Sequence, residues 1–258
     1  MSINVVTGPA RVSGNLFAFM LDVLVAVVRP PFQLKEFLVQ SWFIVKVTII
    51  PTAFVAIPFG AVIALQTGGL IKQFGAQSFT GSAAVLAVVQ QAGPIAVALL
   101  IAGAAGSAIA ADFGARKIRE ELDAMMVLGI DPIQRLVVPR VIACMMVAVF
   151  LNGLVTIVGV AGGYVFNVIL QDGTPGAYLA SFTALAQTSD IVMGMLKAVI
   201  FGFIAAIVAA YKGMNAKGGP KGVGDAVNEA VVITFTLLFV VNFFLSAIYL
   251  QVVPPKGM

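Results

Sequence analysis

Two runs of thirty residues, 82–111 and 141–170, contain no Asp, Glu, Lys or Arg. An α-helix rises about 1.5 Å per residue, so about 20 apolar residues are enough to cross the hydrocarbon core of a bilayer. Hydrophobic residues make up 60% of the chain and charged residues 10%, whereas soluble domains carry about 25% charged residues. The sequence therefore predicts an integral membrane protein. Apolar runs of this length favour an all-α fold over a barrel, whose strands alternate in hydrophobicity.

Five apolar runs lie within residues 42–253, and they predict five transmembrane helices in a single domain that covers 1–258. Pro51 and Pro58 interrupt the first run, and a series of small residues at 102–107 in the second would let helix backbones approach closely. The expected spans are 43–65, 82–111, 141–170, 191–211 and 230–253.

Local signals mark the ends of some spans. A Gln and two Gly at 66–69 are expected to close the first span, and Ser189 or Asp190 to cap the fourth. A glycine-rich loop, 212–225, is expected to separate the fourth span from the fifth.

The N-terminal segment, 1–41, is expected to lie on the membrane surface. Residues 14–29 place their apolar side chains near one helical face and are too few to span a core of about 30 Å. Two prolines at 30–31 end this helix, and a second short interfacial helix is expected at 32–41.

The basic residues are divided unevenly between the two sides of the predicted bundle. Segments 1–41, 112–140 and 212–229 together carry eleven Lys and Arg, whereas the segments on the other side carry two. The positive-inside rule places the first group in the cytoplasm. The prediction is a multi-pass inner-membrane protein with a cytoplasmic N-terminus and an extracytoplasmic C-terminus. The basic residues form no continuous stripe of the kind that indicates nucleic-acid binding.

The segment 112–135 holds 9 of the 26 charged residues and lies between two apolar runs. Ile118, Leu122, Met125 and Gly129 recur at helical spacing within it. One interpretation is a short amphipathic helix, parallel to the membrane, that docks into a groove on a soluble partner. The other is a solvated cytoplasmic loop, and the charge pattern alone does not decide between them.

The chain has no histidine and a single cysteine, Cys144, within an apolar run. No His-based catalysis, metal site or internal disulfide is therefore expected, and no catalytic or metal-ligating residue is predicted. Lys197 is the only charge inside the fourth span. It could extend outward to the interface, or pair with a lipid headgroup or a carboxylate. An intramembrane enzyme would need a serine partner for this lysine, and no such motif is present.

The order and spacing of two blocks of residues resemble the MlaE/YrbE family, permease subunits of ABC lipid transporters that work with MCE proteins. The resemblance covers about residues 35–250. The first block contains Gly93-Pro94, Ala102-Gly103, Gly106 to Ala111, Gly114, Glu120 to Met125, Leu128 to Pro132 and Leu136 to Arg140. The second contains Asp190, Lys197, Phe201-Gly202, Tyr211 to Gly213, Gly218 to Gly224 and Ala230 to Val232.

The resemblance implies that two permease subunits pair, that each docks its cytoplasmic helix on an ATPase subunit, and that ATP hydrolysis rocks the pair around a lipid cavity. No cofactor is expected on this chain, because it lacks a Walker A pattern, so ATP and Mg²⁺ would bind to the partner ATPase. MCE systems of this type are mostly linked to uptake. The residues expected to couple to the ATPase are Arg119, Glu120, Glu121, Asp123, Ala124, Leu128 and Gly129.

The sequence departs from the family where relatives often carry charges. Gln90-Gln91 replace an Arg-Glu pair, and Asn242 replaces an Asp. We therefore expect one of two different permeases of an actinobacterial MCE-type complex, with the partner permease supplying the charges. Candidate residues for the substrate cavity are Gln66, Gln90, Gln91, Lys197 and Asn242. The four amides could instead bond between helices.

Two other function classes remain open from the residues. A secondary transporter would need inverted repeats or paired carboxylates within the spans, and five spans suit an inverted duplication poorly. A membrane anchor that assembles the complex without transporting would leave lipid transport normal when the chain is deleted.

Overall fold

The computed structural model describes residues 4–75, 80–170, 174–182 and 186–253. All regular elements in these ranges are helical, and five helical segments are long and apolar enough to cross a membrane. The predicted all-α membrane fold with five spans is confirmed.

Each span consists of one helix or of several helices in continuous succession. The first is α2 (Leu34–Gln73). The third is η4 (Ile133–Val137) with α7 (Val138–Leu170). The fourth is α10 (Thr188–Met214) and the fifth is α11 (Gly219–Val252).

The second span contains two π-helical segments between α-helices. It runs through α3 (Thr80–Ala87), η2 (Val88–Ala92), α4 (Gly93–Leu100), η3 (Ile101–Gly106) and α5 (Ser107–Ile118). A π-turn bonds residue i to i+5 and is a frequent feature of functional sites.

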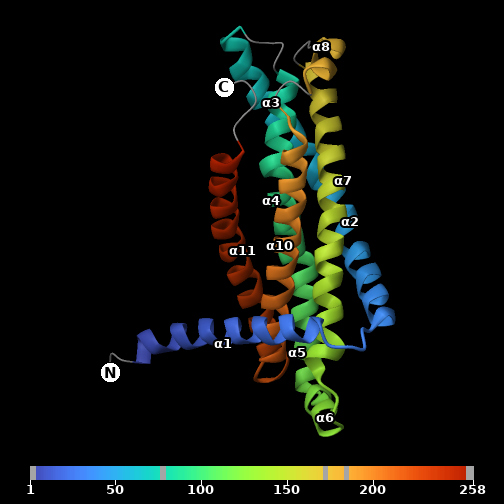
Figure 1. The fold of residues 1–258 in the computed structure, drawn as a ribbon, viewed down its shortest axis with the longest axis vertical. Helices are drawn as coiled ribbons and strands as arrows, with labels where there is room; N and C mark the ends of the chain where they lie inside the picture. The colour runs from blue at the N-terminus through green and yellow to red at the C-terminus, as the bar shows by residue number, and fades with distance from the viewer. Residues whose placement is uncertain (1–3, 76–79, 171–173, 183–185, 254–258) are drawn as a thin grey trace.

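The first helix, α1 (Asn4–Val27), lies across one end of the bundle, nearly at right angles to the spans (Figure 1). The short helix α6 (Glu121–Val127) lies at the same end, whereas α3 and α8 (Pro175–Ala180) lie at the other. The segments that hold most of the basic residues therefore share one end of the molecule. This arrangement agrees with an interfacial α1.

Small residues allow the central helices to pack closely. A Cβ built on Gly60 of α2 would lie 1.9 Å from the carbonyl oxygen of Gly159 on α7, and one on Gly202 of α10 would lie 2.8 Å from the carbonyl oxygen of Cys144. Without an aqueous driving force, helices in a membrane associate through such close packing. Cys144 itself is fully buried, as a small core residue.

Several predicted boundaries were wrong because helices continue through signals that end them in soluble proteins. The expected separate helix at 32–41 is mainly the beginning of α2, which also continues past 66–69 to Gln73. Only residues 215–218 separate α10 from α11, in place of the loop expected at 212–225. Within a bilayer an intact helix satisfies every backbone group, so a glutamine and glycines such as those at 66–69 end a helix less readily there.

The N-cap of the fourth span was also predicted wrongly. Gln187 occupies the N-cap position of α10, and Asp190 is the third helical residue, whose carboxylate accepts a hydrogen bond from the Gln187 backbone N–H. Together they form a capping box.

Candidate functional site

A tight turn follows the second span, where α5 ends at Ile118 and α6 begins at Glu121. Glu120 between them has a φ angle of 58°, in the left-handed region that non-glycine residues rarely adopt. The segment that could hold a short amphipathic helix or a solvated loop is thus divided between two helices. Residues 112–118 extend α5, and α6 has seven residues.

Ion pairs within the chain hold this turn. Arg119 Nε lies 2.7 Å from a carboxylate oxygen of Glu121, and Lys117 Nζ lies 2.8 Å from both carboxylate oxygens of Asp123. Leu122 between them is buried under the turn. Each exposed pair contributes little alone, but a network of them with a buried leucine fixes the geometry of the turn.

The tip of the turn is apolar and exposed. Met126, Val127 and Leu128 have 57%, 87% and 75% of their surfaces exposed, and the chain reverses at Gly129 with a φ angle of 75°. Of the predicted coupling residues, Arg119, Glu120, Ala124, Leu128 and Gly129 are exposed. Glu121 and Asp123 are instead half-buried and engaged in the ion pairs just described.

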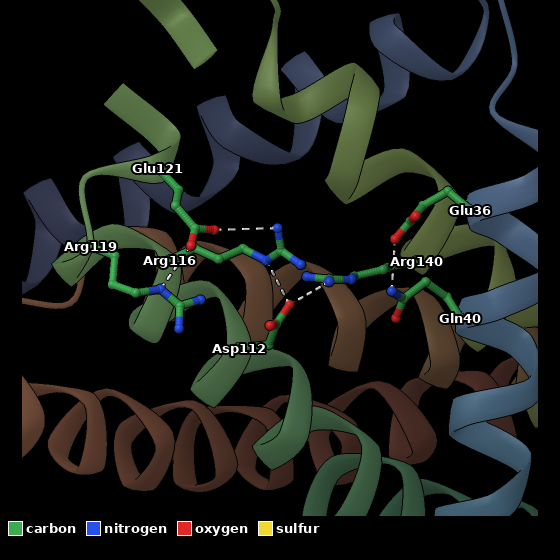
Figure 2. A network of polar contacts seen from close by, with 7 residues as sticks. All are labelled: Glu36, Gln40, Asp112, Arg116, Arg119, Glu121 and Arg140. Carbon is green, nitrogen blue, oxygen red and sulfur yellow. Dashed lines mark hydrogen bonds and ion pairs between the residues drawn. The ribbon is translucent and has the colours of Figure 1, made fainter. Parts of the chain in front are cut away.

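The ion-pair network extends from the turn into the end of the bundle (Figure 2). Asp112 of α5 accepts hydrogen bonds from Arg116, at 3.1 Å, and from Arg140 of α7. Arg116 also lies 3.6 Å from a carboxylate oxygen of Glu121. The turn is therefore connected by charges to the beginning of the third span.

A second polar group lies between spans, near the opposite end. Asp190 at the start of α10 accepts hydrogen bonds from Gln90 Nε2 at 2.7 Å and from the Tyr249 hydroxyl at 2.6 Å. These contacts join η2, α10 and α11, and Gln90 lies within the first π-helical segment.

Lys197 continues this group deeper into the bundle. Its Nζ donates to the Gln90 carbonyl at 3.1 Å and to the Ser246 hydroxyl at 2.7 Å, and only 2% of the residue is exposed. Ser246 also accepts from Gln91, whose Oε1 accepts from Asn242 at 3.4 Å. Lys197 thus neither extends to the interface nor pairs with a carboxylate here.

The structure brings four of the five predicted cavity residues together in this interhelical network. Gln66 lies apart, exposed on α2. Sequence reasoning missed Ser246 and Tyr249, although they lie four and seven residues after Asn242 and so share its helical face. The apolar cavity beside Asn242 measures about 10 Å³, and Phe201 and Phe235 are among its lining residues. That is room for one water molecule and not for a lipid chain.

Comparison with known proteins places these features in a family. Residues 37–248 match the family described as Permease MlaE. The chain belongs to the MlaE permease family. The matched residues include the turn after the second span and, apart from Tyr249, the interhelical network.

Individual relatives of this MlaE-family chain are similar over most of their length. A probable ABC transporter permease protein of Rickettsia felis is 33% identical over 243 residues, 94% of each chain. A probable ABC transporter permease protein of Synechocystis is 38% identical over 192 residues, 74% of this chain and 73% of the relative. The intermembrane phospholipid transport system permease protein MlaE of Haemophilus influenzae is 28% identical over 190 residues, 73% of each chain.

Proposed function

We propose that this chain is the permease subunit of an ATP-driven transporter that moves phospholipids or related hydrophobic molecules at the inner membrane. Membership of the MlaE family supports a permease role, and the Haemophilus relative's name supports a phospholipid substrate. Import is the proposed direction, on the resemblance to MCE-linked uptake systems. The chain itself would catalyse no covalent step, and ATP and Mg²⁺ would bind to a separate ATPase subunit.

The exposed tip of the α6 turn is the observation that carries this proposal. Met126, Val127 and Leu128 present apolar side chains to water at the end of the bundle that holds most of the basic residues. Exposed apolar clusters on a rigid turn are typical of docking sites. We propose that this tip inserts into a groove on the ATPase and transmits its movement to the spans through the Asp112–Arg140 pair.

A second permease and an MCE protein complete the proposed assembly. The apolar cavity beside Asn242 is far too small for a lipid. The surface of α11 carries exposed apolar side chains at Phe239, Phe243 and Phe244. A lipid-sized space would therefore form between two permeases. We propose that the partner permease is a different paralogue, because Gln90, Gln91 and Asn242 leave this chain without the charges that relatives often carry there.

The test is co-purification of the ATPase subunit with the wild-type chain and with Val127→Glu. Val127 is 87% exposed, so the substitution should leave the fold intact. The matched control is Val28→Glu, at a residue 82% exposed and joining α1 to α2. We expect the ATPase to be lost with Val127→Glu and retained with Val28→Glu. Retention with both variants would refute docking at the turn.

A further inference from the structure

A pocket of about 220 Å³ lies between α2 and the junction of α5 with α7. It is separate from the interhelical network around Lys197. Its volume is below the roughly 300 Å³ at which sites for whole drug-sized ligands begin, so it suits a small polar group. The lining residues are Val39, Gln40, Phe43, Ala108, Ile109, Asp112, Arg116 and Arg140.

Arg140 is the residue in this pocket whose hydrogen bonds are incomplete. Only 3% of it is exposed, its guanidinium stacks on the Phe113 ring at 4.3 Å, and its Nη2 bonds to Asp112. Its Nε and Nη1 are buried and have no hydrogen-bond partner among the described residues. A buried donor without an acceptor is costly, and such groups in native proteins are usually satisfied by water or a ligand.

The charges that line the pocket favour an anion as that ligand, because the charged lining residues are two arginines and one carboxylate. Arg116 and Arg140 both bond to the same carboxylate oxygen, Oδ2 of Asp112, and Arg116 also lies 3.6 Å from a carboxylate oxygen of Glu121 outside the pocket. Glu36 and Gln40 reach toward Arg140 from α2 on the side away from Asp112 (Figure 2), and the Glu36 carboxylate accepts a hydrogen bond from Gln40 at 2.8 Å. Two arginines at one site match the geometry of a phosphate group.

The pocket lies at the level where an embedded bundle meets lipid headgroups. Val39 and Phe43 line it, and 54% and 42% of their surfaces are exposed. Next to them on α2, Trp42 is 62% exposed and Lys46 lies 5.1 Å from its ring centroid. An exposed tryptophan beside a lysine is typical of the membrane interface. An acyl chain attached to a bound phosphate could therefore lie along Val39 and Phe43.

We infer that this pocket binds the phosphate group of a membrane phospholipid, with Arg140 and Arg116 as donors. The inference needs only that the chain is embedded in a membrane, and it does not depend on ATPase docking. Through Asp112 and Arg116 the bound phosphate would contact the charges that hold the α6 turn, so the lipid would stabilise the turn as well as the end of the bundle.

Binding is measured on the full chain purified in an uncharged detergent, without ATPase. The probe is dihexanoylphosphatidic acid, with dihexanoylglycerol and inorganic phosphate as separate titrants. Phosphatidic acid should bind. Dihexanoylglycerol should not bind, because dihexanoylglycerol lacks the phosphate group. Inorganic phosphate should bind more weakly, because it lacks the acyl chains. Equal affinity for inorganic phosphate and phosphatidic acid would show a site for free phosphate and overturn the assignment to a lipid.

Gln40→Glu places a carboxylate of the same shape beside Arg140, where it competes with the ligand. We expect it to weaken phosphatidic acid binding by at least about tenfold, the effect of losing one charge-assisted hydrogen bond. Val39→Glu, at the exposed edge of the pocket, should also weaken phosphatidic acid binding. This second variant tests the inference independently if Gln40→Glu folds poorly. Gln73→Glu is the matched control, because it makes the same change at an exposed position at the other end of α2.

A further variant, Ser246→Ala, distinguishes this pocket from the interhelical network. Its affinity for phosphatidic acid should equal that of the wild type. If Ser246→Ala loses affinity for phosphatidic acid and Gln40→Glu does not, the lipid binds among the spans and the inference is wrong. Unchanged affinity in both Gln40→Glu and Val39→Glu, or no binding of phosphatidic acid to the wild type, would also overturn it.

Discussion

Glu120 is the non-glycine residue with a positive φ angle in the described part of the chain. A residue with a Cβ is destabilised by about 1 kcal/mol in the left-handed region, and the ion pairs at the turn, among the described residues, do not include Glu120. Strain of this kind persists where the surroundings fix the backbone, and it is common at sites that must keep one shape. Here the surroundings are the ion pairs and Leu122.

Replacing Glu120 should therefore change stability according to the backbone preference of the new residue. Glu120→Gly is expected to raise the free energy of unfolding by about 1 kcal/mol, because glycine adopts this conformation without strain. Glu120→Val should lower the free energy of unfolding, because a β-branched residue tolerates the left-handed conformation least. Thermal unfolding in detergent measures both. A lower melting temperature for Glu120→Gly would show that the glutamate side chain itself stabilises the turn.

Ser246 is expected to contribute to stability through Lys197. Ser246→Ala removes one of the two acceptors of a buried ammonium group, and we expect a loss of about 1 kcal/mol in the free energy of unfolding. Thr236→Ala is the control on the same helix, because the Thr236 hydroxyl bonds only to the carbonyl of Val232 within α11 and is exposed. Equal melting temperatures for the two variants would mean that the Lys197 contact adds no stability.

At the level of elements, the packing of α2 against α7 depends on the absence of side chains. Gly60→Ala would force α2 and α7 apart, since the new Cβ would lie 1.9 Å from Gly159. Overpacking of this kind costs about 1–3 kcal/mol. Gly69→Ala is the control on α2, because no atom lies within 4 Å of its Cβ position. Unfolding in denaturant should separate the two variants, and equal midpoints would contradict the close packing described here.

The number, order and approximate position of the spans could be predicted, because hydrophobic length alone decides whether a helix crosses a membrane. The helix ends could not. By the rules for soluble proteins, Gly68 and Gly69 predict the end of a helix, yet α2 continues through them. The π-helical segments were not predicted either, because a change from i+4 to i+5 bonding leaves no mark in composition.

The candidate site was predictable in part, because polar residues are easily recognised within apolar runs. Lys197, Gln90, Gln91 and Asn242 are conspicuous in apolar runs, and the structure brings them together. Their arrangement was not predictable, because it depends on which face of α10 meets α11. Arg140 was named only as part of a family motif, and its burial and its two unpaired nitrogens, Nε and Nη1, follow from packing against Phe113 that no local pattern reveals.

For the whole molecule, the two ends of the bundle should lie in different compartments. Cys144 is fully buried, so the background of thiol labelling is low. We expect an impermeant maleimide added to spheroplasts to label Thr174→Cys, at the end that holds α8, and to label Leu128→Cys only after the membrane is permeabilised. Both positions are exposed. The reverse pattern would place the α6 turn outside the cell and exclude docking on a cytoplasmic ATPase.

The π-helical segments in the second span have a consequence for how chain length can vary. Each of these turns holds one residue more than an α-helical turn would. Removing one residue from Ile101–Gly106 should let the segment rewind as an α-helix and leave α5 facing the same neighbours. The same deletion within α7 would rotate everything beyond it by about 100°. Single-residue gaps in homologous genes should therefore be tolerated at η3 and selected against within α7.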